Sequence, residues 1–332
     1  MGNIERLTDA ELGEAGEITG AVSAALDEQV VGQERLKTAM LVALLAEGHL
    51  LVESVPGLAK TLASSTLAHA VSASFSRIQC TPDLLPSDIV GTQVYDPRDH
   101  SFETQLGPVH ANIVLLDEIN RASAKTQSAM LEAMQERQTS IGGEVHPLPR
   151  PFVVLATQNP VEQEGTYVLP EAQMDRFLLK EVLDYPTADE EMSVLDRVED
   201  GTLSRAPAAV GVVGPEDIRR LQSLSQRVYV DTAVKRYIVD LVHATRNART
   251  TLGPELGAYV ETGASPRGTI AFFHVARALA ILGGRSFAVP EDVRALRHSV
   301  LRHRLHLTFE ALADRVAPET LVDAVFGAVP TP

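Results

Sequence analysis

Hydrophobic residues along the chain gather in short runs that end in polar or charged residues. Five runs stand out: 49–53 (HLLVE), 75–80 (FSRIQC), 112–117 (NIVLLD), 152–157 (FVVLAT) and 177–183 (FLLKEVL). The central runs are nearly continuous in Val, Ile and Leu, which is typical of parallel strands covered by helices on both faces. Most of the five are therefore predicted strands of one parallel sheet.

The segments between these runs have a different period. Apolar or small residues recur at helical spacing in 60–73 and 123–137, so strands and helices alternate and the predicted class is α/β. Two segments interrupt the alternation, 90–107 and 138–148. The second contains Gly142-Gly143 between short alternating runs, which predicts a two-residue hairpin. Both segments are expected to project from the sheet as insertions.

Strand signals fade after residue 186. Residues 200–214 (DGTLSRAPAAVGVVG) resemble a linker, and most of the remaining chain has helical periodicity. Helix starts are predicted at Pro215, Asp231, Ser265 and Pro290. The predicted organisation is a core over 1–186, a linker region over 187–214 and a small α-domain over 215–332.

Composition and charge narrow the class of protein. A chain of 332 residues is expected to form roughly two domains, and 45% apolar with 22% charged residues is typical of a globular protein. Lys and Arg number 29 against 44 Asp and Glu, a net charge of −15, which disfavours general binding to nucleic acid. The single Cys80 and the lack of an H-E-x-x-H motif favour a reducing compartment without a structural metal. No apolar run reaches the roughly 18 residues of a membrane span, so a cytoplasmic protein is expected.

The first chemical signal is the octapeptide at 54–61, SVPGLAKT, which follows the run at 49–53 and precedes a predicted helix. Strand, turn, Lys-Thr and helix is the layout of a phosphate-binding loop, in which Lys60 reaches the β- and γ-phosphates and the Thr61 hydroxyl binds Mg²⁺. The strict pattern G-x-x-x-x-G-K-[ST] fails, because Ser54 and Ala59 replace its glycines. From the octapeptide alone, an ordinary β-α turn with a surface lysine stays open.

Polar residues also end two other predicted strands. Asp117 and Glu118 follow 113–116, at the strand end where open α/β sheets bind ligands. Asp117 would hold Mg²⁺ through its water shell, and Glu118 would activate a water for attack on the γ-phosphate. Asn159 follows the next run, where its amide would orient that water. A helix cap at the carboxylates and a turn at Asn159 remain alternative interpretations.

Two arginines add separate information. Ser265 is a plausible N-cap, so Arg267 lies in the first helical turn, where a cation opposes the helix dipole unless both face an anion. Arg176 would pair with Asp175 or Glu171, or supply its charge to a neighbouring molecule. A solvated Arg267 and a locally paired Arg176 are the alternatives.

Taken in order, these features resemble the AAA+ ATPases, and specifically the MoxR family. The resemblance covers almost the whole chain and rests on 30–34 (VVGQE), 55–61 (VPGLAKT), 84–92 (LLPSDIVGT), 115–122 (LLDEINRA), 125–137 (KTQSAMLEAMQER), 156–177 (ATQNPVEQEGTYVLPEAQMDRF) and 265–269 (SPRGT). It implies a P-loop NTPase fold, with a parallel five-stranded sheet flanked by helices and a small all-α lid.

The resemblance also implies roles for individual residues. Asn159 corresponds to the first sensor, Arg176 to the arginine finger, Arg267 to the second sensor, and the pair 117–118 to the metal-binding and hydrolytic carboxylates. Segments 90–107 and 138–148 match the helix-2 and pre-sensor inserts, which face the ring pore in the family. Nucleotide is expected at Val31, Gly32 and Gln33 near the adenine, and at Ser54, Val55, Pro56, Gly57, Leu58, Ala59, Lys60, Thr61 and Leu62. Ser54 departs from the family, which has glycine there.

The function implied by the resemblance is ATP hydrolysis, with Mg²⁺, at the subunit interfaces of a homo-oligomeric ring, expected to be a hexamer. The ring would remodel or mature a client protein, expected to carry a von Willebrand factor A domain. Ser54 motivates an alternative, a nucleotide-binding scaffold with little turnover. A DNA motor is a further alternative, motivated by basic residues that are also typical of a solvated helix face: Arg294, Arg297, His298, Arg302, His303, Arg304 and His306. The absence of N-K-x-D and G-x-S-x-G motifs disfavours a GTPase and a serine hydrolase.

Overall fold

The computed structural model describes residues 6–55, 57–160, 167, 169–201 and 213–332. Pro56 of the predicted phosphate loop, part of the family motif at 156–177 and part of the expected linker at 187–214 lie outside the described residues. The chain divides into two compact units. The core unit comprises 18–173 and 181–220, and the lid unit comprises 1–17, 174–180 and 221–332. Residues 1–17 and 174–180, which the sequence grouped with the core, therefore belong to the lid unit.

A five-stranded sheet with the strand order β2-β5-β8-β1-β9 forms the centre of the fold. Its strands are β1 (Leu50–Glu53), β2 (Phe75–Gln79), β5 (Ile113–Asp117), β8 (Val153–Gln158) and β9 (Leu179–Val182). The pairs β2–β5, β5–β8 and β8–β1 are parallel. All five predicted strands are confirmed. Every residue of β5 is buried, whereas only Ile78 is buried in the edge strand β2, as its more polar sequence requires.

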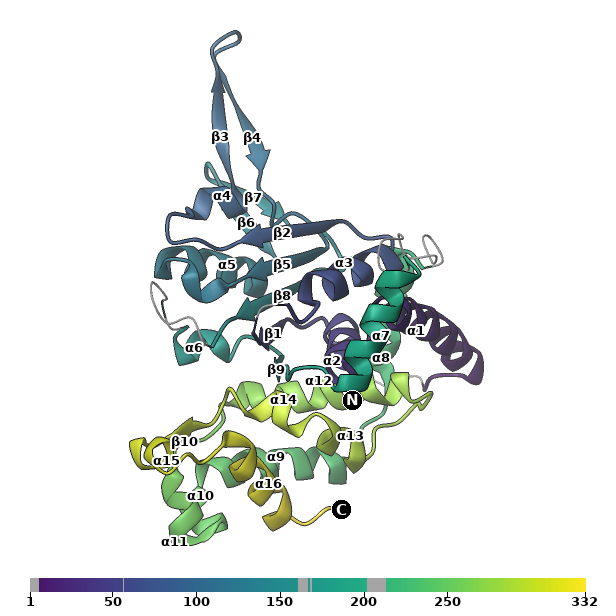
Figure 1. Cartoon of the computed structure of the whole chain (residues 1–332), viewed down its shortest axis with the longest axis vertical. Helices are drawn as coiled ribbons and strands as arrows, with labels where there is room; N and C mark the ends of the chain where they lie inside the picture. Colours follow the sequence, from purple (N-terminus) through teal and green to yellow (C-terminus); the bar gives the residue numbers. More distant parts are fainter. Residues whose placement is uncertain (1–5, 56, 161–166, 168, 202–212) are drawn as a thin grey trace. The chain divides into compact units, whose positions relative to one another are not determined.

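Helices flank this sheet (Figure 1). They include α2 (Glu34–Leu45), α3 (Lys60–Ala70) and α5 (Ala124–Glu136), of which α3 and α5 confirm the two helices predicted from periodicity. Helix α1 (Asp9–Gln29) precedes them in the chain, with its first residues in the lid unit and the rest in the core unit. Helix α2 packs against β1, and α3 packs against β5. Ser123 caps α5 by accepting a hydrogen bond from the Thr126 amide, which fixes where that helix begins.

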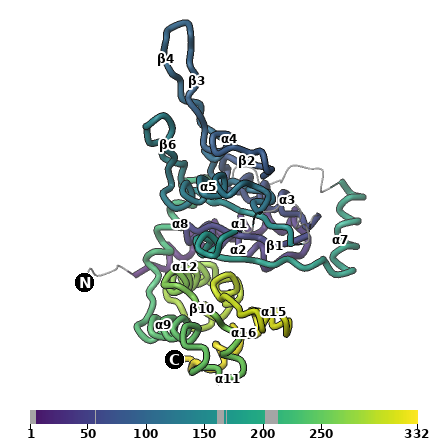
Figure 2. The backbone as a smooth tube through the Cα atoms, turned by 90° about the vertical axis from the view of Figure 1, so that its left-hand side faces the viewer, coloured from purple at the N-terminus to yellow at the C-terminus, as the bar shows by residue number. Residues whose placement is uncertain are grey.

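Both predicted insertions are antiparallel hairpins. Strands β3 (Gly91–Asp96) and β4 (Ser101–Leu106) follow the short helix α4 (Pro86–Val90) and form an arm that extends away from the sheet in both views (Figures 1 and 2). Strands β6 (Gln138–Ile141) and β7 (Glu144–Pro147) lie beside the base of that arm. Gly142 and Gly143 turn between them with φ of 60° and 89°, the left-handed pair that a two-residue hairpin needs.

Helices make up most of the lid unit. Those that begin at the predicted starts are α9 (Thr232–Arg246), α12 (Pro266–Leu282) and α13 (Pro290–Ala295). The predicted start at Pro215 is also confirmed, by α8 (Pro215–Arg227), whose residues 215–220 belong to the core unit and 221–227 to the lid unit. The others are α10 (Ala248–Thr251), α11 (Gly253–Leu256), α14 (Arg297–Leu301), α15 (Phe309–Ala313) and α16 (Pro318–Ala328), with the 3₁₀ turn η3 (Gly257–Tyr259). One antiparallel ladder departs from the all-α expectation, β10 (Val260–Thr262) with β11 (His306–Leu307). Strands of three and two residues are too short for an alternating pattern to reveal them.

The region expected to be a linker contains a helix, α7 (Ala188–Glu199), which belongs to the core unit. Thr187 and Glu190 form its capping box, in which each side chain bonds the other residue's amide. Residues 202–212 lie outside the described chain. Across the described residues, no helix combines the length and the apolar character needed to cross a membrane.

Candidate functional site

The loop between β1 and α3 has the backbone geometry of an anion site. The Ser54 amide donates to the Gln158 carbonyl at 3.1 Å, which continues the pairing of β1 with β8 by one residue. Gly57 and Ala59 then take φ of 88° and 53°, and these left-handed residues turn the chain into α3. No side chain caps the first amides of α3, and such uncapped amides at the positive end of a helix bind phosphate well.

Lys60 is the first residue of α3. Its Nζ donates to the Val55 carbonyl at 3.4 Å, so the ammonium lies under the loop. Burial lowers the pKa of Lys60, while the negative charges of Asp117 and Glu118 oppose that shift. Lys60 borders a small apolar space that is also lined by Met40 and Leu155, which explains why its side chain is poorly solvated. A bound phosphate would restore the favourable environment that the lysine lacks.

Asp117, the last residue of β5, is held from two sides. Its Oδ1 accepts a hydrogen bond from Thr157 Oγ1 at 2.7 Å. Its Oδ2 accepts from Arg77 Nε at 3.2 Å and Nη2 at 2.6 Å. These contacts fix the carboxylate at the carboxyl end of the sheet.

Glu118 takes a left-handed backbone with φ of 56°, an uncommon conformation for a side chain of this size. Its amide donates to Thr157 Oγ1 at 2.8 Å, and its Oε2 accepts from Gln79 Nε2 at 3.1 Å. Arg121 Nη1 lies 3.4 Å from the same carboxylate. Such backbone strain costs on the order of 1–3 kcal/mol and gathers at functional sites. The chain therefore turns Glu118 away from the course of the strand and holds it there.

Three residues of this arrangement were missed in the sequence. Thr157 contacts both acidic residues, and Arg77 and Gln79 orient one carboxylate each. The available signal was the alternation of polar residues along 75–80, because residues 77 and 79 face the same side of β2. Polar residues on an edge strand usually face solvent, and only the pairing of β2 with β5 brings them to the carboxylates.

The remaining predicted phosphate and metal residues lie on the same elements. Asn159 is buried directly after β8, Thr61 is the second residue of α3, and Leu62 follows it. No group of three or more His, Cys, Asp or Glu suited to a metal occurs in the described part of the chain. Mg²⁺ that arrives with a nucleotide needs only one or two protein ligands beside phosphates and water, so Thr61 and Asp117 fit that ion. The roles of Asn159 and Leu62 stay predictions.

The predicted adenine residues precede α2. Gly32 and Gln33 both have positive φ, 61° and 55°, and Gln33 Nε2 donates to the Asp184 carbonyl at 3.3 Å. With φ of 61°, position 32 has a backbone conformation that side chains rarely adopt, so a substitution there would be strained and glycine suits the turn. Leu36 of α2 lines the same apolar space as Lys60. The helix behind this turn thus borders the phosphate loop, which favours the predicted adenine position.

Both predicted arginines lie in the lid unit. Ser265 Oγ accepts a hydrogen bond from the Arg267 amide at 3.0 Å, which confirms the predicted N-cap of α12. The Arg267 side chain is 45% exposed, and its Nη1 lies 3.9 Å from Asp175 Oδ2. Arg176 follows Asp175 in the segment 174–180. The structure therefore places Asp175, the residue before Arg176, next to Arg267 at the start of α12.

The basic residues that suggested a DNA motor are engaged within the chain. Arg297 and His298 contact Asp323 at 2.7 Å and 2.8 Å, and Arg302 contacts Glu319 at 3.0 Å. Residues 302–304 are buried, so this part is not the solvated helix face that the sequence suggested. Because these charges are paired or buried within the chain, the basic run no longer supports a DNA motor.

Ser54, which suggested a scaffold, fits its position. It is buried, its hydroxyl donates to the Val55 carbonyl at 3.1 Å, and it is not among the described residues with positive φ. Glycine is therefore not required by the backbone at this position. The described residues of the loop that do take a left-handed backbone are Gly57 and Ala59.

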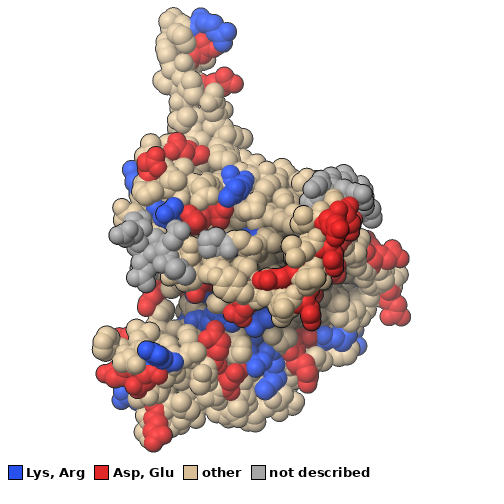
Figure 3. Space-filling view, viewed as in Figure 1, with Lys and Arg blue, Asp and Glu red and all other residues tan. Residues whose placement is uncertain are grey.

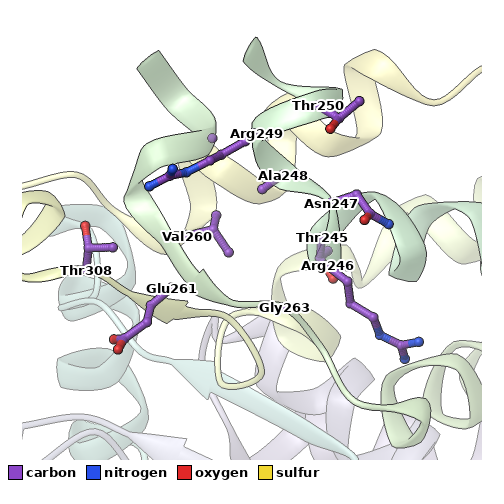
Figure 4. Close-up of a pocket in the computed structure, with 11 residues that line it drawn as sticks. Thr245, Arg246, Asn247, Ala248, Arg249, Thr250, Val260, Glu261, Gly263 and Thr308 are labelled. Atoms are coloured by element: carbon purple, nitrogen blue, oxygen red, sulfur yellow. The ribbon is translucent and has the colours of Figure 1, made fainter. Parts of the chain in front are cut away.

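A polar pocket of about 500 Å³ lies in the lid unit beside β10 (Figure 4). Its lining includes Arg246, Arg249, Glu261 and Thr308. Arg246 and Arg249 point away from each other in Figure 4. A ligand site needs polar groups that converge, and these do not.

Comparison with known proteins agrees with the geometry. Residues 49–179 match the family "ATPase family associated with various cellular activities (AAA)", and residues 257–325 match the "AAA lid domain". The chain is 48% identical to Chaperone MoxR1 of Mycobacterium tuberculosis, over 91% of this chain and 79% of that protein. The chain belongs to the MoxR family of AAA+ ATPases.

Other MoxR relatives and a solved structure extend this similarity. Protein MoxR of Paracoccus denitrificans is 31% identical, over 93% of this chain and 95% of that protein. A crystal structure of a candidate ATPase from Cytophaga hutchinsonii superposes with a TM-score of 0.90 at 39% identity and covers 97% of both chains. The match at 49–179 contains the phosphate loop, both carboxylates, Asn159 and Arg176, and the lid match contains Arg267. The MoxR fold expected from the sequence is thus confirmed.

Proposed function

We propose that this MoxR-family chain hydrolyses ATP at the subunit interfaces of a homo-oligomeric ring, and that the ring remodels or matures a client protein. The observation that carries the proposal is Thr157 Oγ1, which bonds Asp117 Oδ1 at 2.7 Å and the Glu118 amide at 2.8 Å. A buried hydroxyl that fixes two adjacent acidic residues beside Lys60 suits phosphoryl transfer, which depends on positioned charge.

The loop would bind the triphosphate. The first amides of α3 and the Lys60 ammonium would supply positive charge, and backbone N–H groups of the described loop residues would surround the phosphates. Residues 31–33 would contact the adenine. Thr61 and Asp117 would hold Mg²⁺, which neutralises charge on the phosphates when bound.

Glu118 would act as the general base. Its hydrogen bond from Gln79 and its strained backbone aim the carboxylate, which would take the proton of a water attacking the γ-phosphate. Asn159 would orient that water. Arg176 would come from a neighbouring subunit and Arg267 from the lid unit, and both would stabilise charge that develops on the γ-phosphate.

The arm formed by β3 and β4 suits contact with a client. Tyr95 and Phe102 are paired across the hairpin with their rings 5.3 Å apart, and Phe102 is 65% exposed. Val94 and Leu106 are also exposed. Figure 3 shows few charged side chains on this arm, gathered toward its tip. Exposed apolar groups on one projecting hairpin support contact with a protein partner.

The ring is expected to be a hexamer, and the client is expected to carry a von Willebrand factor A domain, as the resemblance to MoxR proteins implies. The name of the Mycobacterium relative, a chaperone, supports a remodelling role. Ser54 no longer supports the alternative of a nucleotide-binding scaffold with little turnover, because this residue has no positive φ and fits its site.

The test compares the parent protein with Lys60→Ala. The parent is expected to bind Mg-ATP and to turn it over in the assembled state, and Lys60→Ala is expected to lose measurable binding in calorimetry while its circular dichroism spectrum is unchanged. Unchanged affinity of the variant would contradict the phosphate site. Binding by the parent without turnover would favour the scaffold.

A further inference from the structure

One buried guanidinium holds the segment that contains Arg176. Arg304 Nε donates to Asp175 Oδ1 at 2.8 Å, and its Nη2 donates to the carbonyls of Phe177 at 2.6 Å and Asp175 at 3.3 Å. Its Nη1 donates to the Leu178 carbonyl at 3.2 Å. These acceptors lie on both sides of Arg176 in the sequence, and the Arg304 side chain is only 2% exposed. Arg304 therefore fixes the backbone from which Arg176 projects.

Asp175 extends the same network to Arg267. Its second oxygen, Oδ2, accepts from Ser265 Oγ at 2.7 Å, and that hydroxyl accepts from the Arg267 amide at 3.0 Å. Arg267 Nη1 lies 3.9 Å from the same Oδ2. One carboxylate thus joins Arg304 to the start of α12, and every member belongs to the lid unit.

The surroundings of Arg304 strengthen these contacts. His303 Nε2 also donates to the Phe177 carbonyl, at 3.1 Å, and burial holds the pKa of His303 well below its ordinary value. Burial lowers the pKa of Arg304 to about 10, against the opposing charge of Asp175, so the guanidinium stays charged at neutral pH. Gly268 lies against its stem, where an added Cβ would meet Arg304 Cδ at 3.4 Å.

A buried pair of this kind is weak evidence for stability, because burying two charges is costly. What the pair provides is a fixed geometry, because the planar guanidinium of Arg304 donates several hydrogen bonds in set directions. Lysine would keep the charge at position 304 but lose that planar group. The network is therefore better suited to positioning than to stabilisation.

We propose that Arg304 is a positioning residue that, through Asp175, holds Arg176 and Arg267 as one rigid assembly, so that both arginines shift together. The inference rests on the proposed function of these two arginines toward ATP. If they reach nucleotides at different interfaces, the network couples one site to the next, since a shift imposed on Arg267 is passed to Arg176.

The test uses Arg304→Lys in the full-length protein, with Arg302→Lys as the matched control. Arg302 is also buried and ion-paired with a carboxylate, that of Glu319 at 3.0 Å, but none of its described contacts is in 174–180. Amide hydrogen exchange of a peptide covering 174–183 is expected to accelerate in Arg304→Lys and to match the parent in Arg302→Lys. Asp175→Asn serves as a second variant, should Arg304→Lys not fold.

A kinetic cycle tests the link to Arg176. Misplacing a catalytic group by about 1 Å costs up to about 100-fold in rate, so kcat of Arg304→Lys is expected to fall with little change in KM. In an Arg176→Ala background, the added Arg304→Lys is expected to lower kcat much less than in the parent. Full additivity of the two changes would overturn the proposal.

Two outcomes separate this inference from the proposed function. If the parent does not hydrolyse ATP, the proposed function fails and hydrogen exchange alone decides whether Arg304 holds 174–180. If the parent is active but exchange in 174–183 is the same in all variants, the proposed function stands and the role of Arg304 is overturned.

Discussion

Thr157 Oγ1 donates to Asp117 Oδ1 at 2.7 Å, so a hydroxyl of β8 holds the carboxylate that ends β5. The same oxygen accepts the Glu118 amide, and this second bond supports the left-handed backbone of Glu118. Parallel pairing of β5 with β8 brings the three groups together at one edge of the sheet. The position of Glu118, the proposed general base, therefore depends on Thr157 of the neighbouring strand.

Replacing Thr157 with Val should damage this arrangement. The variant removes the donor to Asp117 and the acceptor for the Glu118 amide, and leaving buried polar groups unsatisfied costs about 1–3 kcal/mol each. We expect reduced kcat and a lower free energy of unfolding in chemical denaturation. Thr157→Ser keeps the hydroxyl and should retain most of both. Parent-like turnover in Thr157→Val would show that the hydroxyl has no part in placing the base.

Glu118→Gln should separate binding from chemistry. The amide keeps the size of the side chain but cannot accept the proton of water, and loss of a general base typically slows a reaction by 10²- to 10⁴-fold. We expect Mg-ATP affinity close to that of the parent in calorimetry, with turnover at least about 100-fold slower. Glu132→Gln, on the exposed face of α5, is the control and should hydrolyse like the parent. Normal turnover by Glu118→Gln would exclude this residue as the base.

Much of this site could be predicted because its parts are consecutive in the sequence. The loop at 54–61 follows a strand and opens a helix, and Asp117 and Glu118 end the most buried strand. The contacts of Arg77, Gln79 and Thr157 could not be predicted, because they depend on the registers of β2, β5 and β8.

In the lid unit, contacts between residues far apart in the sequence were still harder to predict. Asp175 and Arg304 are separated by 129 positions, and no local pattern pairs them. The basic run at 294–306 looked like a solvated face, since a sequence pattern does not show which carboxylates fold back onto it. Local sequence patterns thus predicted the helices and strands. The side-chain contacts between residues distant in the sequence could be seen only in the structure.

The lid unit should lose one ion pair in acid. Arg227 donates to Glu11 through two nitrogens, Nη1 at 2.5 Å and Nη2 at 3.1 Å, and these bonds hold the pKa of Glu11 at about 2, below its ordinary value of 4.5. A lowered folded-state pKa gives stability that is present above pH 4.5 and is lost as the pH falls toward 2. Glu11→Gln should therefore lower the melting temperature at pH 7.

The same difference between Glu11→Gln and the parent should shrink in acid, as calorimetry between pH 7 and pH 3 would show. Glu17→Gln, an exposed residue of the same helix, should match the parent throughout. A Glu11→Gln difference that is independent of pH would mean that packing, and not the ion pair, accounts for the effect.

Arg176 should act on the ATP of an adjacent subunit. An arginine supplied in trans contributes about 10³- to 10⁵-fold in rate, so rings of Arg176→Ala alone should be nearly inactive, as should rings of Glu118→Gln alone. The two variants fail for different reasons. In a mixed ring, a subunit with intact Glu118 can lie beside one with intact Arg176, and that interface then holds both groups.

Mixed rings are therefore expected to recover a fraction of activity that neither variant shows alone. Turnover is measured across mixing ratios, with subunit exchange verified by native mass spectrometry. Mixing Arg176→Ala with Lys60→Ala gives a second arrangement, because the Lys60 variant cannot bind ATP but still offers Arg176 to its neighbour. Both mixtures should regain activity if the arginine works in trans. If neither does while exchange is complete, Arg176 acts within its own subunit or supports structure alone, since only a group that crosses the interface can be supplied by another chain.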